Sequence, residues 1–290
     1  MATSLEDITS LRLWKGIVAE FVGTLLLTLV GCGSCINLRG DTNVTSPVVQ
    51  IALCFGLSVA TVVWAIAHVS GGHVNPAVTC AMLATRKISL VKAVLFIVFQ
   101  LVGAVVGAGI LYGLTPPKYI GNLGCTLISD KLTPAQALGV ELFVTFVLVF
   151  TVFASCDGKR KDLNGSAPLT IGLSVTMCHL WAIDYTGSSM NTARSFGPAL
   201  IKGNWDGHWV YWAGPIIGGV VAGLLYEHLF AVNASITKAK ACLLTSDYDD
   251  EKYRAKKLKV RIIEEENDLD SPAELEDNGS YPLTEKDSAA

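Results

Sequence analysis

Two asparagines in a repeated motif are the residues best suited to bind a small polar molecule. The motif occurs twice, 116 residues apart, as Asn75-Pro76-Ala77 and as Asn191-Thr192-Ala193. Asparagine is a favoured helix N-cap, and proline suits the first helical position, so the motif predicts the start of a short helix. An asparagine side chain offers two N–H donors and one carbonyl acceptor. Both side chains are therefore candidates for hydrogen bonding at a helix N-terminus.

Charged side chains are rare in the part of the chain that contains both motifs. Residues 1–235 carry 24 of the 47 charged side chains, and residues 236–290 carry the other 23. About a quarter of the residues in an average soluble domain are charged. A body with so few charges belongs in a lipid bilayer, which argues against a cytosolic enzyme, a secreted disulfide scaffold and a nucleic-acid-binding domain.

The sequence contains no convincing catalytic or metal-binding constellation. Its eight cysteines are scattered, mostly inside apolar runs, and do not suggest a disulfide framework. His179 and Asp184 are too weak a signal for a nucleophilic site without further partners. We therefore expect no enzyme activity, no metal site, no cofactor and no nucleic-acid partner.

Apolar segments of sufficient length surround the two motifs. A spanning helix needs about 20 mainly apolar residues. Six stretches qualify, at 16–36, 47–67, 93–114, 135–155, 166–184 and 208–230. Two shorter glycine-rich segments, 68–86 and 185–202, each contain one motif. The sequence predicts an all-α membrane protein with six transmembrane helices and two re-entrant half-helices.

The two halves of the chain are related copies. Besides the asparagine motifs, the tetrapeptide at 56–59 recurs at 172–175. Because each copy has three spans, the second enters the membrane inverted, and the two re-entrant segments meet near the midplane. The expected organisation is a cytoplasmic N-terminus (1–15), a first repeat (16–115), an extracellular linker (116–134), a second repeat (135–232) and a mostly disordered cytoplasmic tail (233–290).

The distribution of Lys and Arg predicts that both termini are cytoplasmic, and we expect the protein to lie in the plasma membrane. With the N-terminus inside, eight basic residues of the body lie in the cytoplasm and four lie outside. Asn43 is then an external glycosylation candidate, and Ser89, after Arg86-Lys87, is an internal phosphorylation candidate. The basic run at 252–261 suggests contact of the tail with anionic lipid or with a protein.

The predicted meeting point of the half-helices suits the passage of water. Two helix N-termini carry roughly half a positive charge each, so together they repel cations and protons in a poorly screened medium. The amides of Asn75 and Asn191 supply donors, and the unwound backbone before each half-helix supplies carbonyl acceptors. Water both donates and accepts hydrogen bonds, and an oxygen held by two amide donors cannot accept a proton from the next water. The sequence thus favours water conduction without proton leakage.

Three segments carry a resemblance to a known family. They are Ser70-Gly71-Gly72-His73-Val74-Asn75-Pro76-Ala77-Val78-Thr79, the run from His179 to Gly187, and the run from Gly187 to Ala199. They resemble the aquaporins, or major intrinsic proteins, and most of all the water-selective animal members. The resemblance covers about residues 10–232. It implies a homotetramer with one pore per subunit and a passive, osmotically driven channel.

The resemblance also assigns expected roles to individual residues. It implies an outer selectivity constriction formed by Phe55, His179, Ser188 and Arg194. Carboxylates in apolar helices by themselves suggest a functional site, such as a proton-coupling group. The resemblance implies instead that Glu20 and Glu141 accept hydrogen bonds from the re-entrant backbone.

Two departures from the family pattern leave alternatives open. Thr192 stands where the second motif ordinarily has proline, and Ser188 stands where many water-selective relatives have a mercurial-sensitive cysteine. Glycerol-conducting relatives typically have a small residue at the His179 position and Asp after the arginine, whereas Ser195 follows Arg194 here. The alternatives are a channel that also passes glycerol or other small neutral solutes, a coupled transporter that uses the two carboxylates, and a structural or adhesion protein with an incidental pore.

Overall fold

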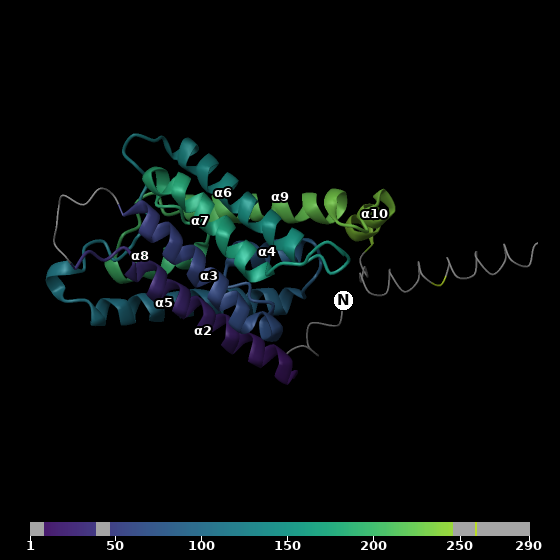
Figure 1. Cartoon of the computed structure of the whole chain (residues 1–290), viewed down its shortest axis with the longest axis horizontal. Coiled ribbons are helices and arrows are strands. Elements are labelled where there is room, and N and C mark those ends of the chain that lie inside the picture. Colours follow the sequence, from purple (N-terminus) through teal and green to yellow (C-terminus); the bar gives the residue numbers. More distant parts are fainter. Residues whose placement is uncertain (1–8, 39–46, 246–258, 260–290) are drawn as a thin grey trace, which may run out of the picture. The chain divides into compact units, whose positions relative to one another are not determined.

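The computed structural model describes residues 9–38, 47–245 and 259, and this part of the chain is helical (Figure 1). The long helices are α2 (Leu11–Gly33), α3 (Val48–Ser70), α5 (Leu90–Leu114), α6 (Pro134–Ser155), α7 (Ala167–Thr186) and α9 (Val210–Leu225). The shorter ones are α4 (Pro76–Ala84), η1 (Pro117–Tyr119), α8 (Thr192–Lys202), η2 (Tyr226–Phe230) and α10 (Ile236–Leu244).

Local sequence explains where the key helices begin and end. Thr133 and Gln136 form a reciprocal capping box at the start of α6, with Pro134 at the first helical position. Helices α3 and α7 end at Gly71 (φ 100°) and Gly187 (φ 76°), whose left-handed backbone stops each helix. Each glycine thereby turns the chain into the segment that leads to an asparagine motif.

Within the described ranges, five helices are long and apolar enough to cross a membrane. They are α2, α3, α5, α6 and the segment Val210–Phe230, which continues α9 through the single wide turn η2. Helix α7 has 20 residues, which gives it about 30 Å of length, but polar side chains lower its mean hydropathy. Helix α2 begins at Leu11, ahead of the predicted span 16–36, because the long side chains of Arg12 and Lys15 remain exposed on the first turn.

The helices of the two repeats pack in matching pairs. Helix α2 packs on α5, α6 packs on α9, and α3 packs on α7. Each half-helix packs against a long helix of the other repeat, α4 against α9 and α8 against α5. Where α3 crosses α7, Gly56 and Gly172 lie so close that a Cβ added to Gly172 would come within 2.3 Å of the Gly56 carbonyl oxygen. This contact joins equivalent residues, as an inverted repeat requires.

Helix α10 is held against the turn that follows α4. Glu227 of η2 forms ion pairs with Lys238 of α10 and, at 2.8 Å, with Lys87 of the turn. The Arg86 guanidinium donates to the Thr245 carbonyl at 2.6 Å. The Val232 amide, just after the last span, also donates to the Asp157 carboxyl at 3.1 Å. Partial burial raises the pKa of this carboxyl, but the hydrogen bonds from the Val232 and Lys159 amides have the larger effect, so its pKa is lowered. The first residues after the last span are therefore docked on the bundle.

Candidate pore

The two asparagines cap the half-helices and also bond to each other's loops. Asn75 Oδ1 accepts from the Ala77 amide at 2.8 Å, and Asn191 Oδ1 accepts from the Ala193 amide at 3.0 Å. Asn75 Nδ2 donates to the Met190 carbonyl at 2.8 Å. Asn191 Nδ2 donates to the Val74 carbonyl, also at 2.8 Å. The two motifs therefore meet, and each fixes the other.

Each amide nitrogen keeps a second donor for a ligand. A side-chain NH₂ group has two N–H bonds, and the bond across to the opposite loop uses one of them. Both asparagines line a cavity of about 130 Å³. The remaining N–H of each amide is thus available to a small acceptor in that cavity.

Strained backbone precedes both asparagines. Val74 and Met190 have φ values of 43° and 53°, a left-handed conformation that is unfavourable for residues with a side chain. Such strain persists only where the surroundings enforce it. Both residues line the cavity, so the strained conformation belongs to its wall.

Two buried carboxylates supply part of that enforcement. Glu20 accepts from the His73 amide at 2.9 Å and from the Val74 amide at 2.6 Å. Glu141 accepts from the Ser189 amide at 2.9 Å and from the Met190 amide at 2.9 Å. The acceptors hold equivalent peptide groups in the two repeats, and both carboxylates are fully buried.

A hydroxyl completes each carboxylate site. Ser70 Oγ donates to Glu20 at 2.6 Å, and Thr186 Oγ1 donates to Glu141 at 2.6 Å. Gln100 adds a fourth hydrogen bond to Glu20 at 2.7 Å. Each carboxylate therefore acts as an acceptor for groups of a re-entrant loop.

Phe55, His179 and Arg194 contact one another in the lining of the cavity. The Phe55 and His179 rings stack with centroids 4.8 Å apart, and the Arg194 guanidinium carbon lies 4.6 Å from the Phe55 centroid. Arg194 Nη1 donates to the Gly124 carbonyl at 2.7 Å. Ser188 Oγ lies 3.3 Å from His179 Nδ1. The four residues predicted to form a constriction thus form one contiguous group.

Two polar atoms of this group have unused hydrogen-bonding capacity. His179 Nε2 and Arg194 Nε are buried and have no hydrogen-bond partner among the described residues. His179 Nδ1 lies 3.0 Å from the Val175 carbonyl, which only accepts, so Nδ1 carries the proton and Nε2 of the neutral ring is an acceptor. The group therefore contains a buried acceptor and a buried cationic donor that the described part of the chain does not satisfy.

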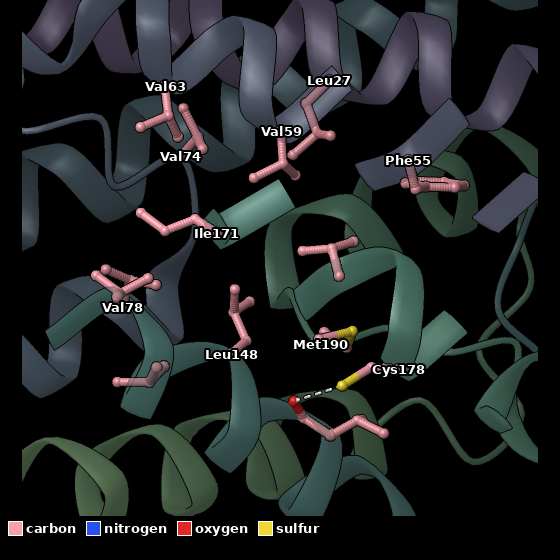
Figure 2. Close-up of a cluster of buried hydrophobic side chains, with 14 of the residues drawn as sticks. Leu27, Phe55, Val59, Val63, Val74, Val78, Leu148, Ile171, Cys178 and Met190 are labelled. Carbon is pink, nitrogen blue, oxygen red and sulfur yellow. Dashed lines mark hydrogen bonds between the residues drawn. The ribbon is translucent and has the colours of Figure 1, made fainter. Parts of the chain in front are cut away.

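Most of the remaining wall of the cavity is apolar. Figure 2 shows side chains from several helices gathered around a common centre. Of the ten that it labels, all but Cys178 line the cavity: Leu27, Phe55, Val59, Val63, Val74, Val78, Leu148, Ile171 and Met190. Aliphatic side chains offer no hydrogen bonds, so a small molecule in the cavity finds polar partners at a few places in its lining: the two asparagines, the loop carbonyls, His73, His179, Ser189 and Arg194.

Thr192 occupies the first position of α8, where Pro76 stands in α4. Its side chain is fully buried, and its hydroxyl has no hydrogen-bond partner among the described residues. It does not line the cavity. The substitution therefore leaves an unsatisfied polar group in the wall behind the pore without adding a polar atom to the lumen.

We expect Thr192→Val and Thr192→Pro to stabilise the protein. Removing an orphaned buried hydroxyl relieves about 1–3 kcal/mol, and proline also restricts the unfolded chain. Thermal unfolding in detergent should shift upward for both variants, while water permeability per molecule stays within twofold of wild type. A lower melting temperature for Thr192→Val would show that the hydroxyl makes a stabilising contact.

Some relevant residues had no clear signal in the sequence. Gly124 and Gln100 bind Arg194 and Glu20 across 70 and 80 residues, respectively. Ser70 and Thr186 were recognisable in principle, because both carry hydroxyls at the repeat spacing of 116. Ser89 is the N-cap of α5, where its side chain accepts from the Lys92 amide at 3.2 Å. Asn43 lies outside the described residues.

The chain matches the model of the major intrinsic protein family over residues 7–226. It therefore belongs to this family. Membership confirms the predicted all-α membrane fold with six spans and two half-helices, and makes the chain an integral membrane protein of a channel family rather than an enzyme.

The sequence of the chain is similar to those of individual aquaporins. The chain is 55% identical to aquaporin-4 of Mus musculus over 226 residues, 78% of this chain and 70% of the relative. It is 58% identical to aquaporin-4 of Homo sapiens over 219 residues, 75% and 68% of the two chains. Its identity to aquaporin-5 of Sus scrofa is 43% over 247 residues, 85% and 92% of the two chains.

A solved structure supports the fold. The X-ray structure of the aquaglyceroporin from Plasmodium falciparum matches with a TM-score of 0.68 at 24% identity, covering 75% of this chain and 96% of that one. At this identity the likeness concerns the fold alone.

Proposed function

We propose that this protein is a passive, water-selective channel that follows osmotic gradients and excludes protons and ions. The observation that carries the proposal is the pair of reciprocal bonds from Asn75 Nδ2 and Asn191 Nδ2 to the opposite loops. Those bonds hold two amides at one point of the cavity, each with one N–H left to donate. A water molecule there accepts two hydrogen bonds and turns its own protons outward.

The electrostatics of the same point exclude cations. Helices α4 and α8 both begin at these asparagines, and each N-terminus carries roughly half a positive charge. The Arg194 side chain adds a full charge at the constriction, and none of the ion pairs in the described part of the chain includes it. A hydronium ion therefore meets positive potential at two successive places.

Larger neutral solutes are discriminated at the constriction. A polyol needs several hydrogen bonds at once, but Phe55 offers only an apolar face to one side of it. Desolvating a hydroxyl without a replacement partner costs about 1–3 kcal/mol. The stacked His179 ring also takes up space that a smaller side chain would leave to solute. We accordingly assign the selectivity filter to Phe55, His179, Ser188 and Arg194.

We further propose, from the sequence, the oligomeric state, the membrane location and the modifications of the channel. The protein forms a homotetramer in the plasma membrane, with both termini and the tail in the cytoplasm. Exposed apolar side chains on the outer faces of α2, α3 and α7 supply surface for lipid and for neighbouring subunits. The basic run at 252–261 contacts anionic lipid, Asn43 accepts glycan outside and Ser89 is phosphorylated inside.

Stopped-flow light scattering on liposomes that contain the purified full-length protein tests the function. Under a sucrose gradient, we expect fast shrinkage with a low activation energy, while a glycerol gradient and a proton-sensitive dye show background flux. Shrinkage no faster than that of empty liposomes contradicts a constitutive water channel.

The same experiment separates the competing functions. Fast glycerol entry would favour a channel for small neutral solutes. Saturable, pH-driven flux would favour a transporter that uses Glu20 and Glu141. Background rates for every solute would favour a structural protein with an incidental pore.

A further inference from the structure

A chain of buried hydroxyls links the segment between η1 and α6 to the pore. Thr126 Oγ1 donates to Ser195 Oγ at 2.9 Å, and Ser195 Oγ donates to Ser189 Oγ at 2.6 Å. Ser189 Oγ then donates to the Asn191 carbonyl at 3.1 Å. All four residues are more than nine-tenths buried. The chain therefore runs in one direction and ends on a pore asparagine.

The same short segment also bonds the constriction directly. Gly124, two residues before Thr126, accepts from Arg194 Nη1 at 2.7 Å. Ser195, which Thr126 binds, directly follows Arg194 in α8. Residues 124 and 126 thus hold the consecutive residues 194 and 195, one through the Arg194 guanidinium and the other through a side-chain hydroxyl.

Two bonds to adjacent residues restrict motion that one bond permits. The Gly124 bond holds the guanidinium, and the Asn191 cap accepts from the Arg194 amide at 3.3 Å. The Thr126 bond adds a link between the same turn of α8 and the segment before α6, and the Ser189 link ties that turn to the backbone that carries Asn191. The separation between Arg194 and the facing His179 ring then depends on both bonds.

We propose that Thr126 is a specificity-determining positioning residue of this channel. It touches no permeant; through Ser195 it sets the position of Arg194, and through Ser189 that of Asn191. This inference rests on the proposed function, because it concerns which solutes the pore admits. It assigns to the segment before α6 a role in selectivity beyond that of a connection between the repeats.

Thr126→Val tests the proposal, because valine keeps the shape of threonine and removes the hydroxyl. In liposomes with the full-length protein, we expect the ratio of glycerol to water permeability to rise roughly five- to tenfold, the effect of losing about one hydrogen bond. Thr126→Ser restores the donor and should return the ratio to the wild-type value. Water permeability itself should change less than twofold.

Thr145→Val is the matched control. Thr145 is also fully buried, but its hydroxyl donates only to the Glu141 backbone carbonyl of its own helix, at 2.7 Å. Its removal should leave the ratio unchanged. If Thr126→Val does not fold, Ser195→Ala breaks the same link from the other side and should raise the ratio to a similar extent.

The outcomes separate this inference from the proposed function. A wild-type channel that conducts water, with equal ratios for Thr126→Val and Thr145→Val, overturns the inference alone. The same holds if Thr126→Ser fails to restore the ratio. If liposomes that contain the wild-type protein shrink no faster than empty ones, the proposed function and the inference are both overturned.

Discussion

Exchange of Glu20 for glutamine is expected to prevent formation of a stable channel. Each carboxylate oxygen accepts one backbone amide, His73 at 2.9 Å on one oxygen and Val74 at 2.6 Å on the other. Either orientation of a glutamine amide therefore places its NH₂ group against a backbone N–H. With Gln100 also losing an acceptor in one orientation, we expect a loss of about 3 kcal/mol in unfolding free energy. Thermal unfolding in detergent and yield of assembled protein measure this effect.

Asp184→Asn provides the control for the loss of a carboxylate charge. Asp184 is exposed near the end of α7, and its neutralisation should not change stability. Glu141→Gln should reproduce the Glu20→Gln defect, because Glu141 makes the equivalent bonds to the second loop. A stable Glu20→Gln protein with wild-type water flux would contradict the loop-holding role. A stable protein that has lost only a pH-driven flux would support a coupled transporter.

Replacing Arg194 with valine is expected to abolish selectivity while leaving water conduction. The guanidinium fills the space beside Phe55, 4.6 Å from its ring centroid, and carries the positive charge of the constriction. Valine widens the passage and removes that charge. Glycerol permeability should rise at least about tenfold, because a hydroxyl in the wider passage keeps a water partner and avoids a desolvation cost of about 1–3 kcal/mol. Proton flux under a pH gradient should rise above the liposome background.

Arg160→Ala separates this effect from the general loss of an arginine. Arg160 lies outside the spans, where it pairs with the exposed Asp162 at 2.6 Å. Its replacement should leave water, glycerol and proton fluxes at wild-type values. Unchanged glycerol exclusion in Arg194→Val would place the selectivity filter elsewhere in the pore.

Features that repeat within the sequence were the most predictable. Both half-helices follow from asparagine caps at a spacing of 116, and the opposite entry of the two loops follows from the odd number of spans. The helix limits were less predictable. Helix α2 gains a turn that carries Arg12 and Lys15, because helical hydrogen bonding does not end where the apolar pattern ends. The last span, by contrast, agrees with the predicted 208–230, since the segment Val210–Phe230 continues through η2.

Features that occur only once were not predictable. Gly124 and Thr126 lie in a segment with no regular helical pattern, and their contacts with Arg194 and Ser195 span 70 and 69 residues. Gln100 bonds Glu20, and among the described residues it has no hydrogen-bonding counterpart at Glu141. Such contacts depend on how distant helices are placed together, and neither local propensity nor the repeat spacing contains that information.

The reciprocal asparagine bonds also constrain how the protein is made. During synthesis, Asn75 emerges 115 residues before Met190, the residue whose carbonyl it binds. Until the second repeat has inserted, the amide of Asn75 and the carbonyl of Val74 both lack their partners in a medium without competing water. The first repeat therefore cannot reach its final state alone, and the lumen closes as a late, cooperative event. A chain truncated between the repeats therefore keeps polar groups without hydrogen-bond partners inside the bilayer, and it cannot form the pore.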